Sequence, residues 1–510
     1  MSRTSGNILA NLSGTAWSAL IGLAMVPLYI RLLGIEAYGL IGFSITLQAI
    51  LQILDFGLSP TVNRELARFS VLEDKAGEAR DFVRTLEAGY WIIGLTLAVG
   101  VWFAAPLIAT RWIKADVLQP TTIEHALRIM SLAIAFQWPV SFYQGGLLGL
   151  QRQVQLNAIN VVVSTFRNGG AALVLWKVSP SLSAYFVWQI VTSCLQVALL
   201  RTAVWRNLPL SDHRPRLVPK LVKNVLGFAS GVSGISIASL ILTQMDKVIL
   251  SRLLSLQVFG YYMLASMAAN GLGALTAPVF NALFPRFSSL AARGDQEGLK
   301  RAYHLGAQLM AVLVLPTAMT LVLFAHDILL LWIGDPVAAL QATPIVRLLV
   351  LGSALNGIMH LPYALQLSHG WTRLGLMISG LFIVTMVPGI ILMAGRFGAV
   401  GAAAVWAFQN ATYVLIGVPL THRRLLLGEG RRWFLEDTLL PLGMALLVGI
   451  AGRRLFAVST SPLQTLAGIL STGAASIGAA ALAARELRAW VTGRLAGRRV
   501  IGPHDGRGVE

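Results

Sequence analysis

Charged residues are scarce in this chain of 510 residues. Asp, Glu, Lys and Arg together make up 12% of it, 56% is hydrophobic, and the mean hydropathy is +0.70. Apolar runs of about 20 residues recur along the whole chain, and a helix of that length spans the ~30 Å hydrocarbon core of a bilayer. The runs are continuous rather than alternating, which favours helices over the strands of a barrel. The composition excludes an ordinary soluble protein and predicts an all-α polytopic membrane protein.

Cysteine is almost absent, and recognisable catalytic motifs are missing. Cys194 is the single cysteine, so no intrachain disulfide can form, and no Cys/His spacing typical of a metal site occurs. The sequence has no P-loop, no Gly-rich nucleotide motif and no His/Glu metal helix. We therefore expect no enzyme, no catalytic or metal site, no cofactor and no nucleotide-driven pumping by this chain alone.

The positive charge is placed in a way that argues against nucleic acid as a partner. The net charge is +18, but the basic residues lie mainly in short segments between apolar runs, where they report topology. With the N-terminus inside, 28 of the 40 Lys and Arg residues fall in cytoplasmic segments, eight fall on the opposite side and four fall within spans. The pattern predicts that both termini lie in the cytoplasm.

Fourteen apolar runs are long enough to be predicted as spans. The first begins at Ile8 and extends for about 26 residues, which is too long for a signal-peptide core, so we expect a retained helix. The longest polar connection is predicted near 62–85. The predicted spans are 8–31, 37–61, 86–109, 122–149, 156–176, 184–204, 224–251, 260–284, 303–330, 344–368, 374–395, 400–420, 435–452 and 463–484.

One stretch of the chain occurs twice, about half a chain apart. Residues 7–39 and 224–260 both open on Asn and an aliphatic pair, reach Ser-Gly, and close on Leu-Leu and an aromatic-Gly pair. The closing segments are LLGIEAYG at 32–39 and LLSLQVFG at 253–260, an offset of 221 residues. Later landmarks repeat at similar offsets: Arg128 with Arg347, and Pro139 with Pro362. Such repeats are typical of transporters.

The repeat predicts the domain organisation. Six spans in each copy give both copies the same orientation, related by an axis along the membrane normal. We expect an N-lobe at 1–205 with spans 1–6, a cytoplasmic linker at 206–223 and a C-lobe at 224–422 with spans 7–12. Residues 423–510 would hold spans 13–14, as a C-terminal helix pair, and a basic cytoplasmic tail.

A few charges lie within predicted spans, where each costs several kcal/mol unless it meets water or a partner. Arg167 lies in the middle of its span, so a cavity or a buried structural pair is expected. Two interpretations of Lys247 and its neighbour Asp246 remain. The pair has a functional role, or both side chains reach the lipid headgroups at the outer end of the span. Arg128 and Arg347 lie near span ends, where interfacial anchoring competes with a cavity role.

Other polar and helix-breaking residues also fall in the spans. Asp55 is either a helix-end carboxylate near loop arginines or an ion or proton site. Many in-span amides would form interhelical hydrogen bonds, and some would suit sugar hydroxyls. Prolines free a backbone carbonyl and offer a kink, so Pro139 and Pro362 are predicted to be equivalent hinges of the two lobes.

Several motifs, in order, resemble a known family. LLGIEAYGL and DFGLSPTVNRELAR in 32–68, MDKVIL at 245–250 with FGYY at 259–262, and RFGAVGAAA at 396–404 are similar to Wzx-type polysaccharide and O-antigen flippases. These belong to the multidrug/oligosaccharidyl-lipid/polysaccharide exporter superfamily. The resemblance covers about residues 5–425 and implies two six-helix lobes, a central cavity, alternating access and a polyprenyl-diphosphate-linked glycan as cargo. The first-half Gly-Ala-Ala turn is missing after Val178.

Three functions compete at this stage. The first is an ion-coupled lipid-linked oligosaccharide flippase, with the lipid-linked glycan, membrane lipid and glycan polymerase or export machinery as partners. A drug/cation antiporter of the same superfamily would need a net acidic cavity, and a membrane-embedded glycan polymerase or ligase would need a large outer loop. For the flippase, the four in-span cations would converge as a cationic cavity on the diphosphate, with Asp246 and Asp55 as coupling or ion-pair candidates. The substrate-binding candidates are Arg167, Lys247, Arg128 and Arg347.

Overall fold

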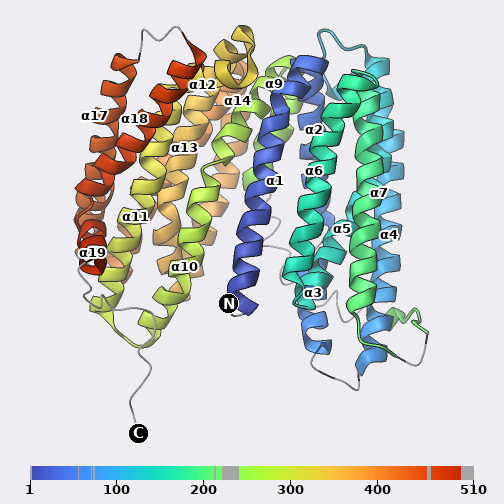
Figure 1. Cartoon of the computed structure of the whole chain (residues 1–510), viewed down its shortest axis with the longest axis horizontal. Helices are drawn as coiled ribbons and strands as arrows, with labels where there is room; N and C mark the ends of the chain where they lie inside the picture. The colour runs from blue at the N-terminus through green and yellow to red at the C-terminus, as the bar shows by residue number, and fades with distance from the viewer. Residues whose placement is uncertain are drawn as a thin grey trace. The chain divides into compact units, whose positions relative to one another are not determined.

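The structure is a computed structural model whose described residues are all helical apart from turns and short loops. It describes residues 3–55, 57–70, 72, 75–211, 214–220, 241–456 and 461–495, without the side chains of 3–13, 53 and 493–495. Within these residues only one isolated β-bridge occurs, between Lys114 and Ser255. The all-α prediction is therefore confirmed (Figure 1).

Contacts divide the chain into two compact units. Unit 1 is Met1–Met263 and unit 2 is Leu264–Glu510, so the division falls within a helix, α9 (Leu256–Asn270). The lobe boundaries expected from the repeat remain a prediction. Most of the first half of the second repeat copy, including Asn224, Ser230 and Gly231, lies outside the described residues.

Unit 1 is a bundle around α5. Helix α5 packs against α3, α4 and α7, while α6 packs against both α1 and α7. Its buried core includes Leu66, Tyr90, Phe142, Tyr143 and Leu200. The helices are α1 (Arg3–Leu33), α2 (Ile35–Leu51), α3 (Leu58–Phe69), α4 (Ala76–Leu107), α5 (Pro120–Gly149), α6 (Gln153–Lys177) and α7 (Leu182–Asn207), with a 3-10 turn at Gln52–Asp55 and a π-helical turn at Ile108–Trp112.

Unit 2 is built around α11 and α13. Helix α11 packs against α10, α13, α17 and α18, and α13 packs against α14. The helices are α10 (Gly273–Ala292), α11 (Gln296–Leu323), α12 (Ala325–Ile333), α13 (Pro336–Ser368), α14 (Thr372–Thr412), α15 (Val418–Leu425), α16 (Gly430–Arg432), α17 (Leu440–Leu455), α18 (Pro462–Ala483) and α19 (Arg485–Leu495), with π-helical turns η4 (Tyr413–Gly417) and η5 (Trp433–Leu439).

Ten helical segments of the described chain have the length and apolar composition to cross a membrane, and α2 is a shorter apolar helix. Each predicted span overlaps helix, but the number fourteen remains a prediction. The predicted break between spans 374–395 and 400–420 is present: Gly398 has φ 59° and ψ −144° inside α14. Only glycine adopts this backbone conformation readily, so the helix is interrupted there.

Two sequence expectations about the region 37–85 were wrong. The span predicted at 37–61 is not one helix, because α2 ends at Leu51 and Gly57 takes a left-handed φ of 75° before α3 begins. The connection expected at 62–85 is largely helical, since α3 extends to Phe69 and α4 begins at Ala76. Leu58, Val62 and Leu66 of α3 are buried, so the apolar face of this amphipathic helix packs against the rest of unit 1.

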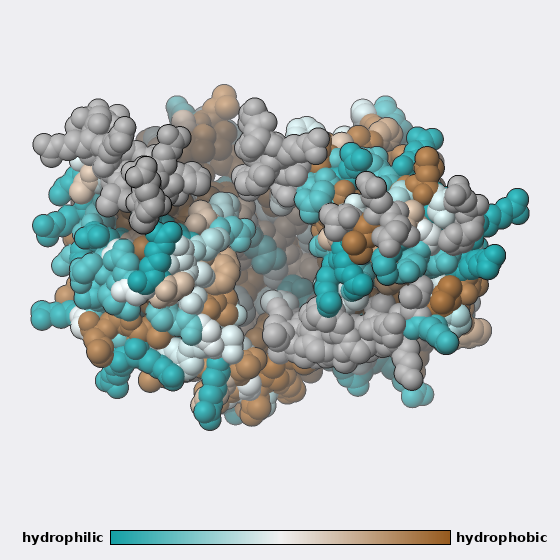
Figure 2. Space-filling model, turned by 90° about the horizontal axis from the view of Figure 1, so that it is seen from below, coloured by the Kyte–Doolittle hydropathy of each residue, from teal (hydrophilic) through white to brown (hydrophobic). Residues whose placement is uncertain are grey.

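Hydrophilic side chains gather at the helix ends. Figure 2 shows the molecule from below the view of Figure 1, where many teal, hydrophilic side chains project at this end of the helices, interspersed with brown apolar ones. On α3 the partly exposed Arg64 and Arg68 both lie close to Glu65. Charged ends on apolar helices are the arrangement that a bilayer requires.

Candidate functional site

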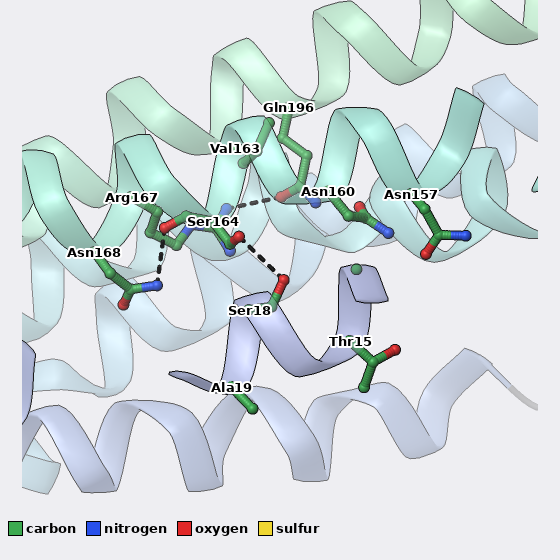
Figure 3. Close-up of a pocket in the computed structure, with 11 residues that line it drawn as sticks. Thr15, Ser18, Ala19, Asn157, Asn160, Val163, Ser164, Arg167, Asn168 and Gln196 are labelled. Atoms are coloured by element: carbon green, nitrogen blue, oxygen red, sulfur yellow. Dashed lines mark hydrogen bonds between the residues drawn. The ribbon is translucent and has the colours of Figure 1, made fainter. Parts of the chain in front are cut away.

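A polar face on α6 forms the wall of a cavity in unit 1. Asn157, Asn160, Ser164, Arg167 and Asn168 recur at three- to four-residue intervals, which places them along one side of the helix (Figure 3). This side faces α1, where the Ser18 hydroxyl donates to the Ser164 Oγ at 3.0 Å. Since Gly14 of α1 has no side chain, it approaches Asn157 closely: a Cβ there would lie 3.0 Å from the Asn157 Oδ1.

Arg167 lines two cavities. One, of about 530 Å³, lies against α1 and is also lined by Asn157, Ser164 and Gln196. The other, of about 360 Å³, is lined by amides and hydroxyls from three further helical segments. These additional polar residues are Gln48, Gln52, Gln137, Ser141 and Gln144. Among the described lining residues of both cavities, Arg167 is the only charged one.

The guanidinium of Arg167 is held by neutral partners from α7. Its Nη2 donates to the Gln196 Oε1 at 2.8 Å and lies 3.4 Å from the Ser193 Oγ. Gln137 also donates to that hydroxyl, at 3.2 Å, so α5, α6 and α7 meet at Ser193. Among the described residues, the buried Arg167 Nε has no hydrogen-bond partner, and no carboxylate pairs with the guanidinium. The arrangement leaves donor capacity unused.

Lys247 and Asp246 contact each other rather than the lining of these cavities. The Lys247 Nζ lies 3.4 Å from the Asp246 Oδ1 and donates to the Thr243 carbonyl at 2.8 Å. The Asp246 Oδ2 accepts a 2.7 Å hydrogen bond from the Tyr262 hydroxyl of α9. Both charged side chains are mostly buried, and neither is a described lining residue of the two cavities around Arg167.

Arg128 and Arg347 each have local partners. Arg128 pairs with Glu124 one turn earlier in α5 at 2.7 Å, and its guanidinium lies 5.6 Å from the Trp102 ring centre. In unit 2, the Arg347 Nε donates to the Val322 carbonyl at 3.1 Å. Of the four predicted cations, Arg167 is the one that lines both described cavities.

Asp55 is partly buried, and the two prolines predicted to be hinges, Pro139 and Pro362, are buried. The Tyr90 hydroxyl donates to the Asp55 Oδ1 at 2.5 Å, and the Ser59 amide donates to its Oδ2 at 3.1 Å, so Asp55 joins α4 to the start of α3. Pro139 lies inside α5 and Pro362 inside α13. Each removes one backbone N–H from its helix and leaves a carbonyl without the usual partner.

Gln196 and Ser193, which hold Arg167, were not predicted from the sequence. They lie in α7, 29 and 26 residues after Arg167, and nothing in their local sequence marks them. The polar face of α6 did carry a signal, since its residues recur at helical spacing. Among the described residues, no group of three or more His, Cys, Asp or Glu side chains is arranged to hold a metal ion.

Comparison with known proteins identifies the family. A sequence profile of the family described as "Polysaccharide biosynthesis protein" matches residues 5–291, more than half of the chain. The chain belongs to this family. It is 21% identical over 403 residues to a Shigella flexneri protein named as a candidate O-antigen transporter, covering 79% of this chain and 94% of that one. It is also 21% identical over 453 residues to the lipopolysaccharide biosynthesis protein WzxC of Escherichia coli (strain K12), covering 85% of each.

Solved structures share the fold of this family member. The lipid II flippase MurJ in an inward closed conformation is similar with a TM-score of 0.71 at 16% identity, over 94% of this chain and all of that one. A multidrug resistance MATE family transporter of the MOP superfamily is similar with a TM-score of 0.63 at 15% identity, over 80% and 94%. The fold class and the resemblance to Wzx-type proteins are confirmed, and the chain is a multi-pass membrane protein.

Proposed function

We propose that this protein is a flippase that moves a polyprenyl-diphosphate-linked oligosaccharide across the bacterial cytoplasmic membrane by alternating access, coupled to an ion. The observation that carries the proposal is Arg167, a cation that lines two cavities rich in amides and hydroxyls and pairs with no carboxylate in the described part of the chain. The names of the relatives, an O-antigen transporter and a lipopolysaccharide biosynthesis protein, support a glycan as the cargo.

The charge of the cavity favours an anionic headgroup. Moving a diphosphate unescorted through hydrocarbon is prohibitively costly, and a positive charge in a wet cavity lowers that cost. Arg binds phosphate through paired, charge-assisted hydrogen bonds, and the buried Arg167 Nε has a donor to spare. An unpaired Arg inside a membrane protein is itself costly, which is a reason to expect a ligand that compensates it.

The neutral lining favours a sugar beside the phosphate. Side-chain amides both donate and accept hydrogen bonds, so they match sugar hydroxyls of varied orientation. Gln48, Gln52 and Gln144 line the smaller cavity next to Arg167, and Asn157 and Asn160 line the larger one. The prenyl chain would remain in lipid throughout, because only the headgroup and glycan need a polar path.

We also propose lobes at 1–205 and 224–422, a linker at 206–223, both termini in the cytoplasm, and partner proteins that polymerise or export the glycan. Lys247, Arg128 and Arg347 would join Arg167 along the path of the headgroup, with Asp246 and Asp55 as coupling candidates. The repeat of Arg128 and Arg347 and of Pro139 and Pro362 supports equivalent roles in the two lobes.

Export of cationic drugs is the alternative, because MATE transporters share the fold. A cation site needs a carboxylate that can face the drug. Asp55 instead accepts hydrogen bonds from Tyr90 and Ser59, and the described lining of both cavities contains no acid. The electrostatics of unit 1 therefore favour the anionic cargo.

Deletion of the gene tests the proposal. We expect a lipid-linked glycan intermediate to accumulate in the cytoplasmic leaflet, and plasmid-borne parent protein to clear it. Resistance to cationic dyes, measured in the same strains, should not depend on the gene. Normal surface glycan in the deletion strain together with increased dye sensitivity would instead support the drug antiporter.

A further inference from the structure

A second buried polar cluster lies in unit 2, and the proposed transport path makes no use of it. His304 of α11 is fully buried, and its Nδ1 lies 2.5 Å from the Oδ2 of the equally buried Asp437 in η5. Its other ring nitrogen, Nε2, lies 3.1 Å from the Glu429 Oε2, in the turn before α16. Both nitrogens of one imidazole therefore face carboxylate oxygens.

This geometry requires one proton more than a neutral histidine supplies. A neutral imidazole has one N–H donor and one lone pair, and a carboxylate can only accept. Two hydrogen bonds from His304 to Asp437 and Glu429 are possible only when the ring is an imidazolium or when one of the acids carries a proton. Without that proton, a lone pair would face a carboxylate at hydrogen-bond distance, which is repulsive.

Asp437 and Glu429 differ in how easily each could move away from His304. The Asp437 Oδ1 accepts a 2.8 Å hydrogen bond from the Gln308 Nε2, and its side chain has no exposed surface. The Glu429 side chain is 19% exposed and follows Gly428, which has a left-handed φ of 83° in the turn between α15 and α16. Loss of the proton should therefore release Glu429 from His304 and leave Asp437 in place. The partner then left to Glu429 is the partly exposed Lys300, whose Nζ lies 3.5 Å from the Glu429 Oε1.

The turn that carries Glu429 is connected to the C-terminal helix. Arg432 in α16 donates to the Glu486 Oε1 of α19 at 2.6 Å. On the other side, the Gln308 Oε1 accepts from the backbone amides of Glu486 and Leu487 at 2.8 and 3.2 Å. A change at His304 would thus reach the end of the C-terminal helix pair through both links.

We propose that His304, Asp437 and Glu429 form a proton-binding site whose occupancy holds the 426–432 turn against α11. The site does not depend on the identity of the cargo. It differs from Asp55, which accepts hydrogen bonds from Tyr90 and Ser59, and from Asp246, which contacts Lys247 and Tyr262. Among the described residues, the other titratable or charged groups around it are Lys300 and Tyr303 on α11, His422 on α15, Arg432 on α16, Glu436 on η5 and Glu486 on α19.

Cysteine labelling as a function of pH tests the site in the full-length protein. In a Cys194→Ser background, Leu427→Cys places a thiol on the turn, where the parent side chain is 76% exposed. Ser70→Cys, on an exposed position between α3 and α4, reports the pH dependence of thiol reactivity itself. We expect the labelling rate at Leu427→Cys, divided by that at Ser70→Cys, to rise severalfold as one proton is lost between about pH 5 and pH 8, where an ordinary imidazole changes charge.

Two variants separate proton binding from simple packing. Glu429→Gln supplies an amide N–H to the His304 Nε2, so a neutral ring satisfies both contacts and the ratio should stay low at every pH. His304→Gln removes the titrating ring and should also abolish the transition. A parent ratio that is flat across the range, or a Glu429→Gln protein that titrates like the parent, would overturn the proposal.

Discussion

Gly39 of α2 and Gly260 of α9 pack against each other at equivalent positions of the repeat. A Cβ on Gly260 would lie 2.5 Å from the Ile35 carbonyl oxygen and 3.3 Å from the Gly39 nitrogen. In the reciprocal sense, a Cβ on Gly39 would collide with the Leu256 carbonyl oxygen and lie 3.3 Å from the Gly260 nitrogen. The aromatic-Gly pairs that mark the repeat in the sequence therefore form a near-symmetric helix crossing.

This crossing predicts that neither glycine accepts a side chain. Gly39→Ala or Gly260→Ala should lower stability by about 1–3 kcal/mol, the usual cost of overpacking, because backbone atoms must move apart. Thermal unfolding of purified protein in detergent measures the effect. Gly89→Ala in α4 is the matched control, since nothing lies within 4 Å of its added Cβ. Equal melting temperatures for all three variants and the parent would contradict the packing.

Glu36 and Gln257 occupy equivalent positions in the two repeated segments but make different contacts. Glu36 accepts hydrogen bonds from the backbone amides of Asp116, Val117 and Leu118 at 2.6–3.1 Å, so it fixes the segment that leads into α5. Its counterpart Gln257 donates to the Tyr261 hydroxyl at 3.1 Å. Glu36→Gln should destabilise the protein, because one carboxylate oxygen that now accepts from backbone would become a donor. A melting temperature equal to that of the parent would show that the hydrogen bonds from residues 116–118 to Glu36 do not contribute to stability.

Pro139 and Pro362 are predicted to act as hinges during the switch between inward and outward states. Substitution by Ala restores the missing backbone N–H within α5 or α13 and should stiffen the helix, so transport should slow in both single variants and more in the double variant. Glycan export at matched protein level is the measurement. Pro462→Ala at the start of α18 is the control, because a proline there removes no internal helical hydrogen bond. Unchanged export in the double variant would rule the hinges out.

The orientation of the chain can be tested directly. In the Cys194→Ser background, cysteines at Ser70 and Thr460 should label from opposite sides of the membrane, Ser70 from the cytoplasm. Thr460 lies outside the described residues, and the prediction for it rests on the distribution of basic residues. Labelling of both positions by an impermeant reagent from the same side would show that the predicted topology is wrong.

The membrane helices could be predicted from the sequence because long apolar runs directly indicate segments that lie in lipid. Breaks within a helix were harder to predict, because they depend on local backbone geometry. The prediction placed the interruption near Gly398, yet it joined α2 to α3, although Gly57 and Pro60 lie at the break. Arg167 was recognised because a mid-span charge is conspicuous. Gln196 and the His304–Asp437 pair were not, since their partners are distant in sequence and only packing brings them together.

The central claim is that the positively charged side chain of Arg167 binds the anionic headgroup during transport. Substitution of Arg167 tests this claim most directly. Glycan export should be compared at equal membrane levels of protein for Arg167→Ala, Arg167→Lys and Lys177→Ala. Lys177 is a cation of the same helix that stacks on Trp176 and lines neither cavity in the described structure, so it serves as the control. We predict that Arg167→Ala abolishes export, Arg167→Lys retains part of it because the charge remains without the bidentate geometry, and Lys177→Ala exports like the parent. Export by Arg167→Ala at the parental rate would contradict the account.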